Sequence, residues 1–262
     1  MPIYDNIGKD YSNTRKSDSR IVKAILDILK TSEVSTIADI GAGTGSYAYA
    51  LANHSYNVIA IEPSETMRSQ AIFHSNIDWI NAHAESLPLS DNAVDAAIIM
   101  LAMHHFKNYQ QALKEAYRIT NKGLIIIFTY DPSMISNFWL TDYFPSLITD
   151  VEASFVHIDR LVSDLENITS KTIKIESFLL PNDLVDSFAA VGWAKPELYL
   201  NSNIRQGISS FFKIKYTEIN DGLLHLEKDL KLGEWDRKYH NLRHQNNYDA
   251  GYRILYTTDL EH

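Results

Sequence analysis

The chain has 262 residues, with 24 Lys and Arg against 33 Asp and Glu, so its net charge is −9 at neutral pH. It contains no cysteine, which excludes disulfides, zinc–thiolate sites, iron–sulfur clusters and a cysteine nucleophile. The acidic balance argues against a nucleic-acid partner, because phosphate contacts need a basic face. Apolar runs such as Leu124 to Phe128 are far shorter than the ~20 residues that span a bilayer, and residues 1–20 lack the apolar core of a secretory signal. The composition predicts a cytoplasmic enzyme that does not enter a membrane.

Residues 18–131 alternate helix-like and strand-like patterns, as in a parallel sheet whose strands are joined by crossover helices. The first predicted helix, residues 18–30, carries Ile21, Ile25 and Ile28 on one face. The strand predicted over residues 94–101 is apolar on both faces, as a central parallel strand should be. The other elements predicted here are strands at 36–40, 56–61, 77–80 and 124–130 and helices at 45–53, 64–74 and 109–119.

The pattern changes after Asp131-Pro132. Residues 133–168 are rich in large apolar side chains and show no clear β pattern, which favours a helical insertion over the sheet edge. Beyond it, the sequence predicts a strand at 172–179, a helix at 183–191, mostly helical structure over 197–245 and a last strand at 251–258. Since no linker or repeat separates these parts, we expect one compact unit with a helical cap.

The segment Asp39-Ile40-Gly41-Ala42-Gly43-Thr44-Gly45 lies where a predicted strand ends and a helix begins. Glycine lets the backbone turn sharply and approach a ligand, and the helix N-terminus offers unpaired N–H groups. A dinucleotide fingerprint would place its third glycine at the position of Ser46, and a P-loop would need Gly-Lys-Ser/Thr. Glu62, at the end of the second strand, can accept two hydrogen bonds from ribose hydroxyls, and Asp39 suits a ligand that carries an ammonium group. Together these features favour S-adenosylmethionine over NAD.

With these residues the chain resembles the class I S-adenosylmethionine-dependent methyltransferases, in particular the small-molecule group that includes the ubiquinone/menaquinone-type enzymes. The resemblance covers residues 4–131 and rests on four segments in order, which are residues 39–45, Ile61-Glu62-Pro63-Ser64 with Met67, residues 82–88, and residues 94–106. It implies an α/β fold with a doubly wound, mostly parallel seven-stranded sheet whose last strand is antiparallel. With the predicted cap insertion, the expected parts are a cofactor-binding core at 1–131, a helical cap at 132–171, and the rest of the sheet with C-terminal helices at 172–262.

The resemblance also implies S-adenosyl-L-methionine as cofactor and S-adenosyl-L-homocysteine as product. The methionine and ribose parts would lie on the glycine loop, and Glu62 would bind the ribose diol. The adenine would lie between the ends of the second and third strands, and Leu101 would close the cofactor from below. The implied cofactor residues are Gly41, Ala42, Gly43, Thr44, Gly45, Glu62, Pro63, Met67, Ala84, Glu85 and Leu101, with Asp39 beside them. His83 departs from the family, which often has Asp there to accept from the adenine amino group.

Candidate residues for the chemistry lie outside this set. His104 and His105 follow the fourth strand and could remove a proton from the acceptor, because imidazole titrates near neutrality. Arg15 could hold the methionine carboxylate or an acidic substrate, or be a surface arginine, and Tyr11 precedes it near the expected substrate. Trp139 and Tyr143 are expected to face the acceptor, although aromatic residues of a cap can equally form its core. No residue pattern predicts a metal site.

The predicted function is methyl transfer to a small-molecule acceptor, achieved mainly by in-line positioning under the cap. Two alternatives remain open from the sequence. One is a catalytically silent module of the same fold that binds S-adenosylmethionine, and the other is a different nucleotide-dependent enzyme on the same sheet, such as a short dehydrogenase. The sequence leaves the acceptor and the oligomeric state open.

Overall fold

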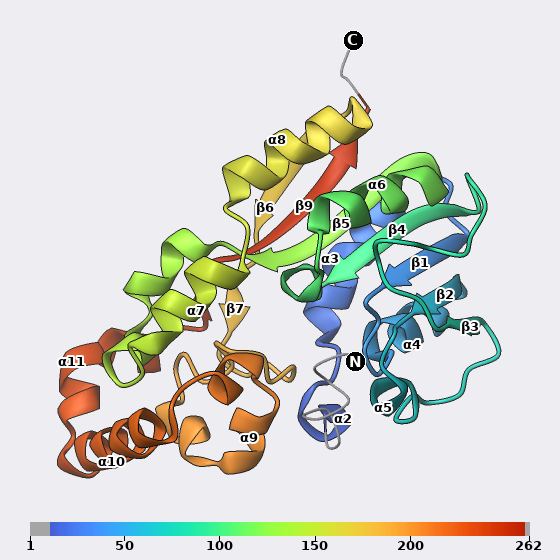
Figure 1. Ribbon diagram of the computed structural model, residues 1–262. Coiled ribbons are helices and arrows are strands. Elements are labelled where there is room, and N and C mark those ends of the chain that lie inside the picture. Colours follow the sequence, from blue (N-terminus) through green and yellow to red (C-terminus); the bar gives the residue numbers. More distant parts are fainter. Residues whose placement is uncertain (1–10, 260–262) are drawn as a thin grey trace.

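The computed structural model describes residues 11–259, which form a twisted seven-stranded sheet with helices on both faces (Figure 1). The strand order is β3-β2-β1-β4-β5-β9-β6, and β9 runs antiparallel to both of its neighbours. This confirms the mostly parallel sheet and the antiparallel last strand. The strands are β1 (Thr36–Ile40), β2 (Asn57–Ile61), β3 (Ile77–Ile80), β4 (Val94–Met100), β5 (Thr120–Tyr130), β6 (Thr172–Ser177) and β9 (Tyr252–Thr258). A separate pair joins β7 (Leu180–Pro181) to β8 (Asn247–Tyr248).

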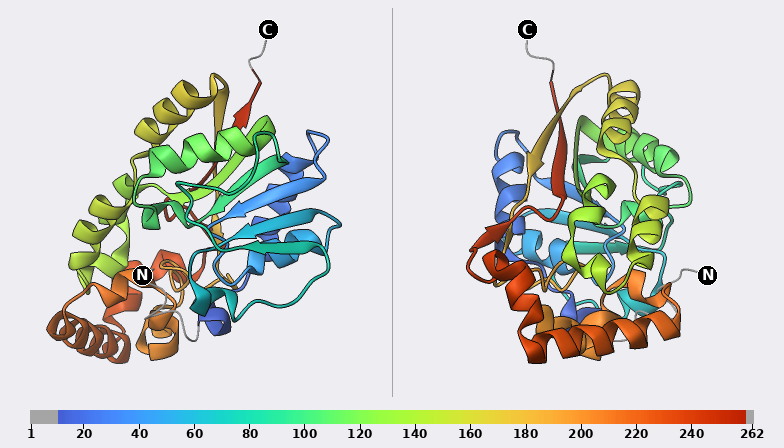
Figure 2. Two further views of the ribbon diagram at one scale, coloured as in Figure 1. Left: turned by 45° about the vertical axis from the view of Figure 1, so that its right-hand side comes forward. Right: turned by 90° about the vertical axis from the view of Figure 1, so that its left-hand side faces the viewer.

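Helices flank the sheet, with α3 on one side and α6 and α8 on the other (Figure 2). The central strand β4 shows why both faces are covered, because Ile98 points into the core under α3 and α4 while Ile99 points into the core under α6 and α8. Alternate residues of one buried strand thus supply two apolar layers. The helices of ten or more residues are α3 (Ser19–Leu29), α6 (Tyr109–Ile119), α8 (Ile158–Thr169), α10 (Tyr216–Leu232) and α11 (Glu234–Arg243), and the shorter ones are α2 (Tyr11–Thr14), α4 (Ser46–Ala52), α5 (Glu65–Arg68), α7 (Ser146–Ser154) and α9 (Ser202–Gln206).

The helix α3 illustrates how local sequence defines an element. Asp18 caps its N-terminus by accepting a hydrogen bond from the backbone N–H of Arg20 at 3.0 Å. Ile21, Ile25 and Leu29 follow at helical spacing and are fully buried against the sheet. The expected range of 18–30 therefore matches the observed helix to within one residue at each end.

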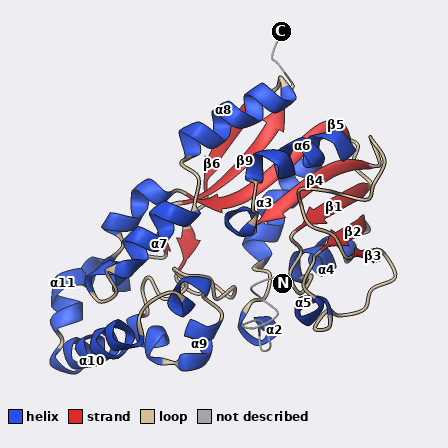
Figure 3. Cartoon of the chain, in the orientation of Figure 1, coloured by secondary structure: helices blue, strands red, loops and turns tan. Residues whose placement is uncertain are grey.

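The helical cap lies beyond the carboxyl ends of the parallel strands, and Figure 3 shows it as a cluster of helices beside the sheet. It contains α7 with the 3₁₀ helices η2 (Pro132–Asn137) and η3 (Trp139–Asp142), and also α9, α10, α11, η4 (Pro196–Leu200) and η5 (Ser209–Phe212). The expected cap at 132–171 differs from this arrangement, because α8 packs against α6 and β6 in the sheet layers. Residues 196–243 supply the rest of the cap instead.

Two predicted helices are wrong in whole or in part. Residues 183–191 form turns and bends, because their backbone groups bond to the N-terminal segment: Val185 N–H to the Asp18 carboxylate at 3.1 Å and Ser187 N–H to the Thr14 carbonyl at 3.1 Å. The helix predicted at 64–74 ends at Arg68, and Phe73 beyond it is 89% exposed. Without an apolar face to bury, such a short helix has little to stabilise further turns.

Candidate functional site

A cavity of about 420 Å³, here called the outer cavity, opens at the carboxyl ends of β1, β2 and β4. This is the edge at which open α/β sheets bind their ligands. Most residues predicted to bind cofactor lie on its wall, namely Arg15, Gly41, Ala42, Gly43, Thr44, Glu62, Pro63, Met67, Ala84, Glu85 and Leu101. Tyr11, His104, His105 and the departing residue His83 also line it. The tertiary structure thus brings four separate sequence segments to one site.

The glycine loop packs closely against side chains of neighbouring segments. Gly41 has a φ of 77°, and a Cβ atom there would lie 2.6 Å from the Cβ of Ala102. Gly45 has a φ of 78°, and a Cβ there would lie 2.6 Å from the ring of Trp79. Gly45 does not line the cavity but begins α4 behind it, so its role is to let the chain turn. Both positions combine a left-handed backbone with a lack of space, which only glycine satisfies.

Glu62 connects the end of β2 to the glycine loop. Its Oε2 accepts a hydrogen bond from the Gly43 N–H at 3.0 Å, and its Oε1 accepts one from the Ser64 N–H at 2.8 Å. The side chain is buried yet reaches the cavity wall. A carboxylate has about four acceptor positions, so the two backbone bonds fix its orientation without exhausting its capacity to accept.

Asp39 lies behind the loop and does not line either of the cavities described here. It is 1% exposed, and its Oδ1 has no hydrogen-bond partner among residues 11–259. Burial raises the pKa of this carboxyl to about 7, and the negative charge of Glu62 adds to the effect. A cationic ligand in the outer cavity would favour the ionised form of Asp39. Among the described residues, no hydrogen-bond donor reaches its Oδ1.

A buried polar cluster closes one side of the outer cavity. The Arg15 guanidinium forms an ion pair with Asp186 and also donates to the Tyr11 hydroxyl, while the Tyr47 hydroxyl donates to Asp186 at 3.0 Å. Arg15 is therefore not a surface arginine. Sequence reasoning missed Asp186 and Tyr47, and no local pattern could have found Asp186, which lies 171 positions from Arg15.

His104 and His105 form the 3₁₀ turn η1 (Met103–His105) after β4. Burial holds the pKa of His104 well below its ordinary value, and repulsion from a protonated His105 and from the positive charges of Lys213 and Arg15 would lower it further. Burial likewise lowers the pKa of His105 to about 4, with Lys213 and Arg15 acting in the same direction. Both imidazoles are therefore neutral at physiological pH and able to accept a hydrogen bond, while the lowered pKa makes each a weaker proton acceptor than a free imidazole.

A second, smaller cavity of about 70 Å³ adjoins the first, and we call it the inner cavity. Arg15, Leu101, His104 and His105 line both cavities. The rest of the inner wall comes from β5, η2, α7, the loop before η4, the α9–η5 region and β9, and consists mainly of aromatic and small residues. It includes Tyr130, Phe138, Phe155, Phe188 and Tyr252.

Trp139 and Tyr143 line neither of these two cavities. Trp139 is 4% exposed, and its indole N–H donates to the Trp193 carbonyl at 2.9 Å while its ring packs edge-on against Trp235. The Tyr143 hydroxyl donates to Asp229 of α10 at 2.8 Å. The expectation that these two side chains face the acceptor does not fit this geometry, because both form the core of the cap.

The described part of the chain holds no group of three or more His, Asp or Glu side chains placed to bind a metal ion. Among residues 11–259, no helix is both long and apolar enough to cross a bilayer.

Comparison with known proteins shows that the chain is similar to methyltransferases. A family model described as "Methyltransferase domain" matches residues 38–128. A crystal structure titled "Putative methyltransferase from antibiotic biosynthesis pathway", from Anabaena variabilis, is 44% identical, covers 94% of this chain and 99% of its own, and superposes with a TM-score of 0.89. An uncharacterized methyltransferase of Alkaliphilus oremlandii is 26% identical over 199 residues, or 73% of this chain and 84% of its own. A ubiquinone/menaquinone biosynthesis C-methyltransferase of Rubrivivax gelatinosus is 34% identical over 89 residues, which span 33% of this chain and 36% of that enzyme.

Proposed function

The chain belongs to the class I S-adenosylmethionine-dependent methyltransferases, and from this premise we propose that it methylates a small molecule held between the glycine loop and the helical cap. The observation that carries the proposal is the outer cavity, where Glu62 and the glycine loop meet the paired histidines. The proposed site of action is the cytoplasm. In the catalytically silent alternative, the same cavity would bind the cofactor without turnover.

The family implies S-adenosylmethionine as cofactor, and three features of the cavity fit that molecule. Gly41 and Gly43 line the cavity without a side chain, so a ligand can approach their backbone closely. Glu62 is held by two backbone N–H groups in an orientation that suits a ribose diol. Asp39 lies behind the glycine loop, and its Oδ1 has no partner among the described residues. Its carboxylate would attract the positively charged end of the ligand. Pro63, Met67, Ala84 and Glu85 would surround the adenine, and Arg15 would face the methionine carboxylate.

When bound, S-adenosylmethionine supplies a methyl group on a cationic sulfur, and its transfer to an O–H or N–H acceptor leaves S-adenosylhomocysteine and one proton. The protein's main contribution is positioning, because well-aligned reactants can gain roughly 7–11 kcal/mol from proximity and orientation. A general base adds only about 10²–10⁴-fold. The neutral imidazoles of His104 and His105 stand at the junction of the two cavities and would receive that proton.

Glu62→Ala tests the cofactor site. Each charge-assisted hydrogen bond from Glu62 to ribose should contribute about 1.5–3 kcal/mol, so the variant should bind S-adenosylmethionine ten to a thousand times more weakly in calorimetry. Its stability should fall as well, since the N–H groups of Gly43 and Ser64 lose their partner. Glu65→Ala, an exposed carboxylate three residues on in α5, is the matched control and should change neither quantity. Wild-type affinity in folded Glu62→Ala would refute the assignment.

The acceptor itself can be sought without prior assumptions. Incubation of the protein and labelled S-adenosylmethionine with a soluble metabolite extract, followed by mass spectrometry, should yield a labelled small molecule. Removal of both imidazoles, His104 and His105, should lower turnover and leave cofactor affinity nearly unchanged. Binding of the cofactor without methyl consumption in any extract would favour the silent module.

A further inference from the structure

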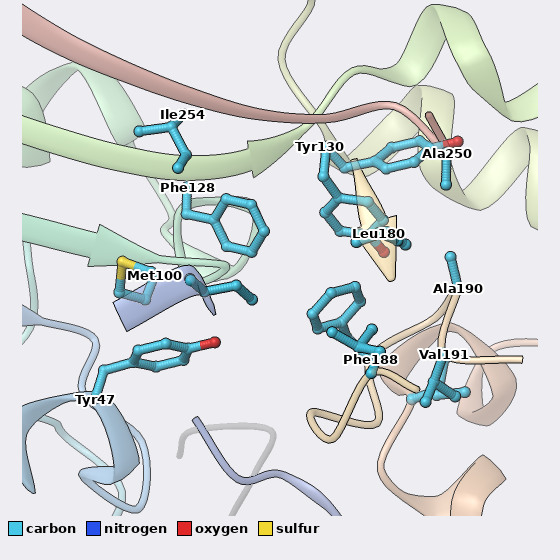
Figure 4. Close-up of a cluster of buried hydrophobic side chains, with 14 of the residues drawn as sticks. Tyr47, Met100, Phe128, Tyr130, Leu180, Phe188, Ala190, Val191, Ala250 and Ile254 are labelled. Carbon is cyan, nitrogen blue, oxygen red and sulfur yellow. The ribbon is translucent and has the colours of Figure 1, made fainter. Parts of the chain in front are cut away.

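The inner cavity has walls made mostly of aromatic rings. Tyr130 contacts Phe155 edge-on with ring centres 5.7 Å apart, and Phe188 packs on Tyr252 at 4.5 Å. Figure 4 shows Phe128, Tyr130 and Phe188 gathered between β5 and the loop that follows β7. On the side of the outer cavity, the ring of His104 stacks on Phe155 at 4.3 Å with an angle of 21° between the planes. Walls of this kind favour a flat apolar ligand, because stacked and edge-on contacts between planar rings stabilise the complex.

One polar atom on this wall has no partner. Tyr130 is 6% exposed, and its hydroxyl makes no hydrogen bond within the part of the chain that the structure describes. A buried hydroxyl without a hydrogen-bond partner destabilises the folded protein. Because Tyr130 lines the inner cavity, a ligand with a carbonyl or hydroxyl oxygen at its inner end would supply the missing bond.

The charges around the inner cavity discriminate against ionic ligands. No Asp or Glu among residues 11–259 lines it, so a cationic ligand would find no counter-charge on the wall. Arg15, the one charged residue of the described chain that lines it, is already paired with buried Asp186. Lys213, which lines the adjoining outer cavity, is paired with Asp150 at 2.6 Å. An anionic ligand would therefore compete with existing carboxylates, and either ion would lose its hydration in an aromatic surrounding.

Size sets a further limit. A dry apolar cavity of about 150 Å³ holds benzene, whereas the inner cavity measures about 70 Å³. At less than half that volume, it can hold only the inner end of a one-ring molecule, so the rest of the ring and the reacting atom would lie at the junction beside His104 and His105.

We propose that the inner cavity is the acceptor subsite and that it selects an uncharged, single-ring planar molecule, which accepts a hydrogen bond from Tyr130 at its inner end and presents its nucleophilic O–H or N–H toward the histidines. This inference rests on the proposed function, because it assigns the second substrate of the same reaction. Neither Tyr130 nor the loop residue Phe188 belongs to the segments that carry the family resemblance.

The test measures binding of three matched probes to protein saturated with S-adenosylhomocysteine, by calorimetry at pH 7.5. They are 4-hydroxybenzamide, 4-hydroxybenzoate and 4-hydroxybenzylamine, which share one phenolic ring and differ in charge. The uncharged amide should bind at least tenfold more tightly than either ion. It should also bind at least tenfold more tightly than its saturated counterpart, 4-hydroxycyclohexanecarboxamide, which has the same polar groups and no planar ring.

Tyr130→Phe should weaken amide binding threefold to tenfold while leaving the urea midpoint unchanged or raised, since the lost hydroxyl has no partner among residues 11–259. Tyr256→Phe, on the neighbouring strand β9 with its hydroxyl bonded to Glu176, is the matched control and should bind like the wild type. Equal or tighter binding of a charged probe or of the saturated analogue, binding by none, or unchanged binding in Tyr130→Phe would each overturn the inference. If S-adenosylhomocysteine itself fails to bind, the proposed function falls and this inference falls with it.

Discussion

Substitution of Gly41 by alanine separates the two reasons for glycine in the glycine loop. The first is its φ of 77°, which costs an L-residue about 1–2 kcal/mol. The second is the lack of space, because the new Cβ would lie 2.6 Å from the Cβ of Ala102. Neither carbon can rotate away, so the backbone must move, and overpacking of this kind is typically destabilising by about 1–3 kcal/mol. The expected loss in the free energy of unfolding is thus about 2–5 kcal/mol.

Gly233, between α10 and α11, provides a control for the backbone contribution. Its φ is 71°, and a Cβ there meets nothing within 4 Å. Gly233→Ala should therefore lose only about 1–2 kcal/mol. The difference between the two variants, about 1–3 kcal/mol, reports the close approach of Gly41 to Ala102.

Urea unfolding monitored by fluorescence measures both variants, with the midpoint read at an unchanged slope. Calorimetry with S-adenosylmethionine on the folded proteins adds a second measurement, in which Gly41→Ala should bind more weakly and Gly233→Ala should match the wild type. Equal losses of stability in the two variants would refute the argument from close approach, because the left-handed backbone would then account for the whole effect.

Three further outcomes follow from the structure. Trp139→Phe should lower the free energy of unfolding by about 1–3 kcal/mol, because a hydrogen bond and ring volume are lost, and the acceptor KM should not change. A raised KM would show that Trp139 contacts the acceptor after all. For His105, whose pKa is about 4 when folded and near 6.5 when unfolded, the unfolded state alone takes up a proton as the pH falls from 6.5 to 4. Wild-type stability should therefore decline relative to His105→Gln over that window by at most roughly 3 kcal/mol in urea titrations, and parallel curves would contradict this. Asp186→Asn leaves the buried charge of Arg15 without its partner and should destabilise the protein by about 3–5 kcal/mol. Asp183→Asn, in an exposed ion pair with Arg20, should leave the urea midpoint nearly unchanged, and similar midpoints for both variants would disprove the structural role of the buried pair.

The sequence by itself determined the parts of the protein that depend on local pattern. Strands β1 to β4 and helices α3 and α6 appear within one or two residues of their expected positions, because periodic burial and caps such as Asp18 act within a single element. The glycine loop is equally visible in the sequence, because the positive φ angles and close contacts at Gly41 and Gly45 require glycine. Glu62 is visible as an acidic residue directly after β2. These segments reach one cavity because parallel strands place their carboxyl ends at the same edge.

Only the tertiary structure decided how the rest of the chain completes the site. Residues 183–191 have a helical pattern, yet the N–H groups of Val185 and Ser187 bond to the segment before α3 and the stretch stays irregular. That loop carries Asp186 to Arg15 and Phe188 to the inner cavity. Trp139 lies in the core of the cap because α11 and the loop before η4 surround it. The physical reason is the same in each case: a side chain's partner lies far along the chain, and backbone hydrogen bonds and burial are satisfied by whichever distant segment packs there.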